Sequence, residues 1–472
     1  MRLATIFTLM LVLAVATARA QEFPIANGND NTFGGGGAYD GTNFLFGILG
    51  DAQNKYSITA QFVSPTGVLV GSRISLGQMG STPLVAFDGT KYLMVWTDSF
   101  PSFAGGDTNG IGNIYGQFLS TSGALIGSRF TLVTDVNIKF AQGRGSISYQ
   151  DTTYFLTYLK GGDHHHQYMY GQRISRTGSL IGAPIQISSH YARECAVAFD
   201  GTNYLVAWCR VEHPNVDKAI YGQFVSKTGT LVGTNFVIDE SDNASDNPVT
   251  MTFDGTKFWV AYHEQAADTN ERWNIYARFV STSGVVASRF MVCDSTTYPT
   301  FASAAFDGTN YLITWMEFGA TPRVQGRFFN ASGVPLNAPF TVFGILGGKV
   351  PVGGVGGFVN GKFVLSATRV NSSFGEGDVY GLFLPSSTAD VDEEGVNLHP
   401  GQYALMQNYP NPFNPSTTIR YIVGTEGYTS LRVYNLLGSE IATLVDEVKK
   451  PGMYNVEWNA ADVPCGLYFY QL

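Results

Sequence analysis

The chain has 472 residues, a formal net charge of −9 and only 14% charged residues. Because it is mildly acidic and has no basic stripe, nucleic acid is excluded as an expected partner. Four cysteines (Cys195, Cys209, Cys293 and Cys465) are too few for a disulfide scaffold, and their spacing matches no zinc motif.

Residues 1–20 have the pattern of a secretory signal peptide. Arg2 precedes an apolar run that ends near Val15, and Ala18-Arg19-Ala20 resembles a cleavage site. The apolar run is too short to span a bilayer well, and no later segment is long and apolar enough. We therefore expect export into the periplasm and no transmembrane segment.

One hairpin-like sequence, AFDGTNYLVAW at 198–208, recurs along the chain. An aromatic residue after the turn marks each copy, at intervals of about fifty residues: Phe44, Tyr92, Tyr154, Tyr204, Phe258, Tyr311 and Phe363. Each copy contains four strand-like pieces. A repeat of four strands at this interval predicts a β-propeller with one blade per copy.

The seventh copy stops at Pro385, after its third strand. Phe23-Pro24-Ile25-Ala26, which follows the predicted signal peptide, resembles the fourth strands of other copies. We therefore predict an all-β fold with a seven-bladed propeller over residues 21–386, whose last blade is completed by the N-terminal strand. This closure removes the exposed edges of an open stack.

The loops between second and third strands vary most in sequence, so we expect the functional face at that end of the blades. The residues at which the second strands reach this face are mostly charged: Asp98, Lys160, Arg210, Glu264, Glu317 and Arg369. One interpretation is a belt of ion pairs between neighbouring blades, such as Asp98–Lys160, Arg210–Glu264 and Glu317–Arg369.

Two functional interpretations of these charged residues also stay open. They could form a polar ring that binds a sugar or peptide ligand. Alternatively, Glu264 and Glu317 could be the acid/base pair of a glycan-degrading hydrolase, which requires two carboxylates at a suitable separation.

Other residues near the same face could also take part in binding. Trp273 could stack on a sugar ring or pack at the rim. His164 and His166, in a run of three histidines, could bind a metal weakly, but adjacent side chains rarely converge on one ion. The sequence carries no nucleophile elbow, phosphate loop, dinucleotide fingerprint or zinc-protease motif, so we expect no cofactor and favour a binding protein over an enzyme.

Cys195 and Cys209 lie on the two strands of one predicted hairpin. If its loop has three residues, the two side chains face each other and could form a disulfide in an oxidising compartment. A loop shorter or longer by one residue would place them on opposite faces.

An acidic linker over residues 387–402 separates the repeats from a different pattern at 403–472, where alternating strands predict a small immunoglobulin-like β-sandwich. This segment opens with an Asn- and Pro-rich motif: Asn408, Tyr409, Pro410, Asn411, Pro412, Phe413, Asn414 and Pro415.

Together with VYNLLG at 433–438 and GLYFY at 466–470, the motif closely resembles the type A sorting domains of the bacterial type IX secretion system. The repeats resemble those of secreted bacterial propeller proteins with FDGTNYLV and IYGQFVS signatures. The resemblance implies recognition by the type IX machinery, followed by release or attachment at the outer cell surface. It also implies that the sorting domain is truncated at Leu472, and that Cys465 stands where the family has serine.

From the sequence we therefore expect a secreted or surface-displayed propeller that binds a polysaccharide or protein through its variable loops. A glycan-degrading hydrolase and a structural or adhesive surface protein are the alternatives.

Overall fold

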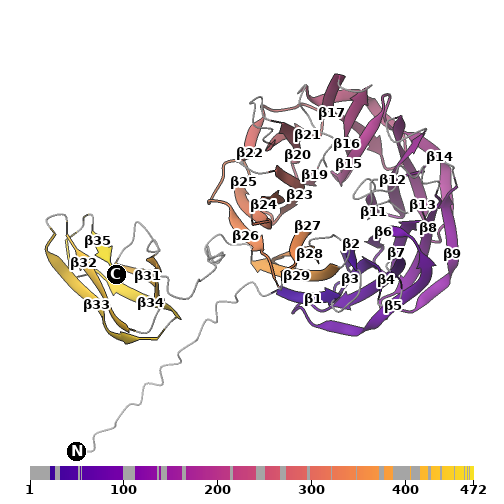
Figure 1. Cartoon of the computed structure of the whole chain (residues 1–472). Coiled ribbons are helices and arrows are strands. Elements are labelled where there is room, and N and C mark those ends of the chain that lie inside the picture. Colours follow the sequence, from indigo (N-terminus) through magenta and orange to yellow (C-terminus); the bar gives the residue numbers. More distant parts are fainter. Residues whose placement is uncertain are drawn as a thin grey trace, which may run out of the picture. The chain divides into compact units, whose positions relative to one another are not determined.

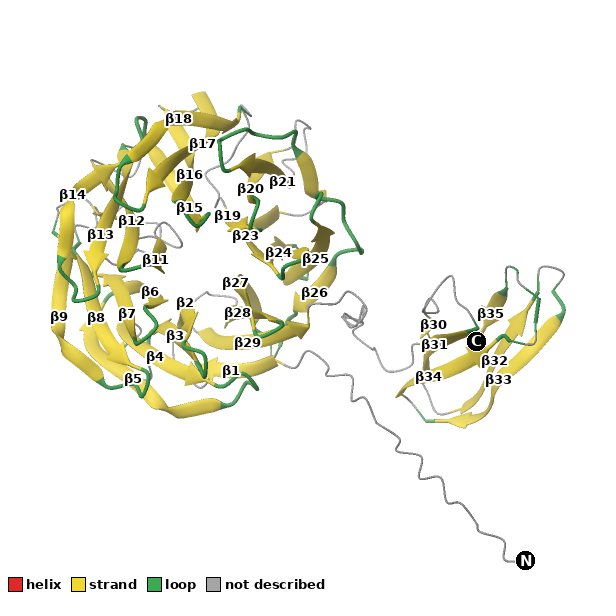
Figure 2. Ribbon diagram, turned by 180° about the vertical axis from the view of Figure 1, so that it is seen from behind, coloured by secondary structure: helices red, strands yellow, loops and turns green. Residues whose placement is uncertain are grey.

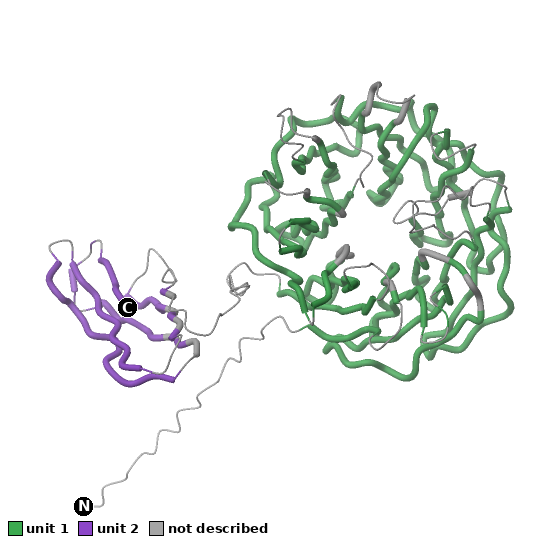
Figure 3. Tube along the Cα trace, viewed as in Figure 1, with its two compact units in different colours: residues 1–393 green, residues 394–472 purple. Residues whose placement is uncertain are grey.

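The computed structural model describes residues 22–472 except for several internal segments. The segments outside the description are 27–31, 52–53, 55, 99–111, 135–137, 140–145, 162–165, 213–215, 241–249, 266–272, 295–297, 320, 347, 372–376, 386–403, 406–414, 424–426, 436–437, 451, 462, 465 and 467. The chain divides into two compact units, residues 1–393 and 394–472, each of which is described by itself (Figure 3). The predicted signal peptide lies outside the described residues.

The described part of unit 1 consists of antiparallel sheets that follow one another around a ring (Figure 1). We number the sheets by chain order. The first contains β2 (Phe33–Tyr39), β3 (Phe44–Leu49), β4 (Ser57–Val63) and β5 (Leu69–Met79). The second contains β6 (Ser81–Phe87), β7 (Lys91–Thr97), β8 (Ile114–Ser120) and β9 (Leu125–Val133). The third contains β10 (Ile138–Lys139), β11 (Ser146–Gln150), β12 (Thr153–Gly161), β13 (Gln167–Ser175) and β14 (Leu180–Gln186).

The later sheets repeat the same order. The fourth contains β15 (Ala192–Phe199), β16 (Asn203–Glu212), β17 (Val216–Ser226) and β18 (Leu231–Asp239). The fifth contains β19 (Thr250–Phe253), β20 (Lys257–Gln265), β21 (Trp273–Ser281) and β22 (Phe290–Asp294). The sixth contains β23 (Tyr298–Phe306), β24 (Asn310–Phe318), β25 (Arg323–Asn330) and β26 (Phe340–Phe343). The seventh contains β27 (Val350–Val359), β28 (Lys362–Val370), β29 (Gly377–Pro385) and β1 (Glu22–Ala26).

In each sheet the first strand lies nearest the ring axis and the last strand lies outermost (Figure 2). No helix in the described part of the chain is long and apolar enough to cross a membrane.

The repeated Asp-Gly turn has a local cause that the fourth sheet illustrates. The Oδ1 atom of Asp200 accepts hydrogen bonds from the backbone amides of Thr202 and Asn203, both at 2.7 Å. Gly201 has a φ of 95°, which glycine adopts without a steric penalty. The amide of Asp200 donates to the carbonyl of Asn203, so the hairpin loop has two residues. We call this end of the sheets the turn side and the opposite end the loop side.

The N-terminal strand completes the seventh sheet, as the sequence predicts. β1 pairs antiparallel with β29, and Phe23 lies opposite Gly381. A Cβ added at Gly381 would lie 2.3 Å from the Phe23 ring, and one at Gly67 of the first sheet would lie 2.6 Å from it. Phe130, on the outermost strand of the second sheet, packs against two glycines in the same way. β1 therefore performs the packing role of an outermost strand.

Neighbouring sheets share hydrophobic clusters made largely by their second strands. The repeated aromatics of these strands are fully buried, as expected for a core between sheets: Trp96, Tyr158, Trp208, Tyr262 and Trp315. The seam between the fifth and sixth sheets, for example, contains Trp259 from β20 and Trp315 from β24.

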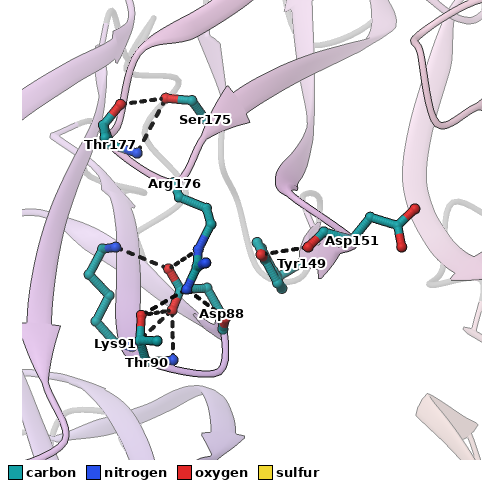
Figure 4. Close-up of polar contacts among 8 residues, drawn as sticks. All are labelled: Asp88, Thr90, Lys91, Tyr149, Asp151, Ser175, Arg176 and Thr177. Atoms are coloured by element: carbon teal, nitrogen blue, oxygen red, sulfur yellow. Dashed lines mark hydrogen bonds and ion pairs between the residues drawn. The ribbon is translucent and has the colours of Figure 1, made fainter.

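Polar contacts also join neighbouring sheets on the turn side (Figure 4). The buried carboxylate of Asp88 in the second sheet binds Lys91 at 3.1 Å and Arg176 of the third sheet at 3.3 Å. Burial raises the pKa of Asp88, but hydrogen bonds from Thr90, Arg176 and nearby backbone amides outweigh it and hold the pKa well below its usual range. In the same way, the Tyr311 hydroxyl of the sixth sheet donates to Asp254 of the fifth at 2.6 Å.

Unit 2 contains two three-stranded sheets. One has the order β30 (Ala404–Leu405), β31 (Ser416–Val423), β34 (Gly452–Asn459); the other has the order β33 (Glu440–Lys449), β32 (Gly427–Tyr434), β35 (Phe469–Gln471). Ile419 and Tyr421 of β31 share a buried cluster with Leu431 of β32 and Val445 of β33. The two sheets therefore form one core.

Candidate functional site

The candidate site is the loop side of unit 1, where the second strands end. Here the antiparallel register places these residues opposite the first part of the third strand or the residue before it: Asp98 pairs with Asn113, which precedes β8, Arg210 lies opposite Ala219, and Glu317 opposite Arg323. The side chains of Asp98, Lys160, Arg210, Glu264 and Glu317 are half-buried, whereas Arg369 is buried.

Asp98 and Lys160 make contacts within their own sheets. The Asp98 carboxylate accepts hydrogen bonds from Asn113 Nδ2 at 3.3 Å and from the Tyr115 hydroxyl at 3.1 Å. Lys160 Nζ lies 5.7 Å from the centroid of the Tyr170 ring. Asp98 is thus held by neutral donors.

Glu264 and Glu317 are each bound by an arginine of the same sheet. Glu264 binds Arg289 at 2.7 Å. Glu317 binds Arg323 at 3.0 Å and also accepts hydrogen bonds from Trp315 Nε1 at 3.3 Å and Gln325 Nε2 at 3.4 Å. Each carboxylate therefore already has a cationic partner.

Arg369 joins the N-terminal strand to the sixth and seventh sheets. Its guanidinium donates to the Glu22 carboxylate of β1 at 2.8 Å and to the Gly344 carbonyl beyond β26 at 3.0 Å, and lies 4.7 Å from the Tyr380 ring centroid. The expected Glu317–Arg369 pair is wrong because Glu22 and Arg323 are the nearer partners. Arg369 is only 2% exposed and acts as a structural clamp.

Trp273 and the histidines have different surroundings. Trp273 begins β21, is half-buried and lies opposite Gln265. The His166 ring packs against Tyr191 at a centroid distance of 4.8 Å. His164 lies outside the described residues, so its role as a metal ligand stays a prediction.

The possible disulfide between Cys195 and Cys209 does not form in this structure. The hairpin loop has two residues instead of three, and a bulge at Glu194 shifts the register further, so Cys195 lies opposite Trp208 and Cys209 opposite Arg193. The two thiols consequently belong to different hydrophobic clusters, on opposite faces of the sheet.

On the loop side, an ion pair between the fourth and fifth sheets was not predicted. Arg278 of β21 donates to the buried carboxylate of Asp239, at the loop-side end of β18, at 2.6 Å. In the first four sheets a glutamine occupies the position of Arg278 and binds carbonyls of the outermost strand, as Gln117 does. The replacement of that glutamine by arginine is the sequence signal that could have revealed the pair.

The sorting motif can be placed only at its end. Residues 408–414 (Asn408 to Asn414) lie outside the described residues, and Pro415 directly precedes β31. The carbonyl of Pro415 accepts a hydrogen bond from Ala460 N at 2.9 Å. The end of the motif is thereby fixed beside the end of β34.

Residues 407–472 match the family of secretion system C-terminal sorting domains. This part of the chain is therefore a type IX sorting domain, as the sequence motif indicates. The domain means that the protein is exported and then either attached to the outer cell surface or secreted, with the type IX machinery as its partner.

No curated protein is significantly similar in sequence to the chain. Among solved structures, a polysaccharide lyase, Uly1, has a TM-score of 0.50 and 11% identity over 78% of this chain and 93% of its own. Hydrazine synthase from Kuenenia stuttgartiensis has a TM-score of 0.46 and 15% identity over 72% of this chain and 92% of its own. A subtype N10 neuraminidase-like protein of the strain A/little yellow-shouldered bat/Guatemala has a TM-score of 0.43 and 9% identity over 66% of this chain and 94% of its own. At these identities the likeness to Uly1 concerns the propeller-like all-β fold alone.

Proposed function

We propose that unit 1 is a seven-bladed propeller over residues 21–386 that binds a polysaccharide or protein ligand on its loop side. In this proposal residues 1–20 are the signal peptide, residues 387–402 are the linker, and residues 403–472 form an immunoglobulin-like sorting domain. Export to the cell surface would place the loop side in contact with extracellular polymers.

The observation that carries this proposal is the concentration of polar side chains at the loop-side ends of the second strands. Asp98, Lys160, Arg210, Glu264 and Glu317 are all half-buried there, next to tyrosine rings or hydrogen-bonding groups. Rigid strands that present such groups suit ligand recognition, because little side-chain freedom is lost on binding. Arg369 is left out of the proposed site because Glu22 and Gly344 use its donors.

The contacts of Glu264 and Glu317 favour binding over hydrolysis. Hydrolysis by such a pair requires two carboxylates that are both available to the scissile glycosidic bond. Each of the two glutamates binds an arginine.

A glycan array with the mature chain, followed by a turnover assay on every glycan that binds, tests the proposal. Specific binding without turnover is the expected result. Hydrolysis that Glu264→Gln or Glu317→Gln abolishes would support the hydrolase instead. A protein with no glycan hit and no protein ligand on a surface-protein array would have a structural or adhesive role.

A further inference from the structure

The loop-side seam between the third and fourth sheets contains a group of aromatic rings. His166 and Tyr168, at the start of β13, both pack against Tyr191, which directly precedes β15, at centroid distances of 4.8 and 5.1 Å. All three side chains are half-buried. The starts of these two strands therefore lie together at the surface.

Among the described residues, two buried polar side chains in this seam lack hydrogen-bond partners. Gln167, between His166 and Tyr168, is 1% exposed, and neither its Nε2 nor its Oε1 has a partner in the described part of the chain. Two residues further on, Met169 points to the same side of β13 and packs in the same cluster as Trp208 of β16. Trp208 is also 1% exposed, and its Nε1 has no partner among the residues that the structure describes. A buried polar group without a hydrogen-bond partner lowers the stability of the fold, and such groups are rare in native proteins. A ligand that supplies the missing partner would explain them.

The sixth sheet shows what satisfies the same indole elsewhere in the repeat. Trp315 occupies the position of Trp208, four residues after the repeat aromatic. Its Nε1 donates to the Glu317 carboxylate, which also accepts hydrogen bonds from Arg323 Nε at 3.1 Å and Gln325 Nε2 at 3.4 Å. An indole, a guanidinium and an amide thus surround one carboxylate.

At the seam between the third and fourth sheets the same three kinds of donor are present, the amide from β13 and the other two from β16, but the position of Glu317 is taken by Arg210. The Arg210 guanidinium donates to the Tyr221 hydroxyl at 2.9 Å and lies 5.4 Å from the centroid of that ring. The donors are then the Trp208 indole, the Gln167 amide and the Arg210 guanidinium. These are the same kinds of donor that bind the Glu317 carboxylate in the sixth sheet. The carboxylate itself has no counterpart at this position, because Arg210 occupies it.

We propose that this seam binds the carboxylate of a uronic acid residue in an acidic polysaccharide. The carboxylate accepts hydrogen bonds from Trp208, Gln167 and Arg210, with Arg210 turning away from Tyr221 to admit it. Tyr191, half-buried where the chain enters β15, packs against the apolar face of the sugar, which favours a uronate over an acidic peptide. This inference rests on the proposed function and names the ligand class for one part of the loop side.

Calorimetric titration of the full mature chain tests the inference. The probes are oligogalacturonate, oligomannuronate and oligoglucuronate, each compared with its carboxyl-reduced neutral counterpart. We expect at least one uronate to bind and its reduced counterpart to bind at least about tenfold more weakly, as for the loss of a charge-assisted hydrogen bond. Binding should also weaken with added salt.

The main variant is Arg210→Glu, which rebuilds the arrangement of the sixth sheet. The new carboxylate should occupy the ligand position beside Trp208, keep the fold intact and reduce uronate affinity at least about tenfold. Arg129→Glu is the matched control, because Arg129 lies over the ring of Tyr115 at 4.1 Å and undergoes the same charge change. Gln167→Leu is a second variant that removes a buried unsatisfied amide, so it should fold at least as well and still lose affinity.

Several results would overturn the inference. They are equal affinity for a uronate and its reduced counterpart, equal loss in Arg210→Glu and Arg129→Glu, unchanged affinity in Gln167→Leu, or equally tight binding of oligoglutamate. If these results appear while a neutral glycan binds, the proposed function stands and only the uronate site fails. If no glycan or protein binds at all, both fail.

Discussion

Removal of the Tyr311 hydroxyl tests whether polar contacts on the turn side stabilise the ring. Tyr311 is fully buried, and its hydroxyl donates at 2.6 Å to the Asp254 carboxylate, whose side chain is 3% exposed. Tyr311→Phe removes a hydrogen bond to a charged group, which contributes about 1.5–3 kcal/mol to the free energy of unfolding. The repeat itself has phenylalanine at this position in three sheets, Phe44, Phe258 and Phe363, so the ring fits.

The same contact makes the loss depend on pH. Burial raises the pKa of Asp254, but hydrogen bonds from Lys257, Tyr311 and Thr256 outweigh it and hold the pKa well below its usual range. A carboxyl whose pKa is lowered on folding stabilises the folded state above its unfolded pKa of about 3.9, and this stabilisation is lost as the pH falls toward the folded pKa. The difference between wild type and Tyr311→Phe should therefore be largest at neutral pH and shrink below about pH 4.

Urea unfolding followed by tryptophan fluorescence measures the effect, because unit 2 contributes only Trp458 to the signal. Tyr149→Phe is the matched control: its hydroxyl donates to the carbonyl of Asp151 at an exposed site, so the change should cost less than about 0.5 kcal/mol at every pH. A loss of less than about 0.5 kcal/mol for Tyr311→Phe at neutral pH, or a loss that does not depend on pH, would refute the reasoning.

Three further predictions concern ring closure and the cysteines. Gly381→Ala should destabilise unit 1 by about 1–3 kcal/mol in urea unfolding, because the added Cβ would meet the Phe23 ring; an unchanged midpoint would contradict the packing of β1. Arg369→Met should cost about 2–3 kcal/mol and make β1 the first segment to lose amide protection in hydrogen exchange; protection equal to wild type would show that the clamp is dispensable. Cys195 and Cys209 should both resist alkylation in the folded protein and react only after unfolding, since both are buried and burial raises the pKa of Cys195 to about 12; a mass two units lower, with neither thiol reactive after unfolding, would indicate the disulfide instead.

The order of strands could be read from the sequence because each turn has its own chemical marker. In the fourth sheet, Asp200-Gly201 marks the turn between the first two strands, and Ser226-Lys227-Thr228-Gly229 marks the turn between the last two. Phe23 resembles the aromatics of other outermost strands. Register was harder to predict. The loop length around Gly201 depends on whether Asp200 pairs with Asn203, a hydrogen bond that the sequence does not reveal, and the bulge at Glu194 adds a second shift.

The strand-end residues of the site were predictable, but their partners were not. Glu317 and Arg323 are separated by a short segment, and this spacing could have indicated their pairing across one hairpin. The choice of Glu22 as the partner of Arg369 depends on a contact between the two ends of unit 1, which repeat spacing cannot show. Gln167 was missed because the histidine run beside it suggested a solvated loop.

The two ends of the sheets use their polar groups differently. On the turn side, Asp88 and Asp254 bind groups from the next sheet, so their charges hold neighbouring sheets together. On the loop side, Glu264 and Glu317 bind arginines of their own sheets, the Arg278–Asp239 pair joins the fourth and fifth sheets, and Arg369 and Glu22 close the seventh. Cohesion between sheets through the turn side allows side chains such as Arg210 to vary between repeats without opening the ring. A ligand whose carboxylate takes the place of a side chain such as Glu317 in one sheet can therefore be bound on the loop side without weakening the ring.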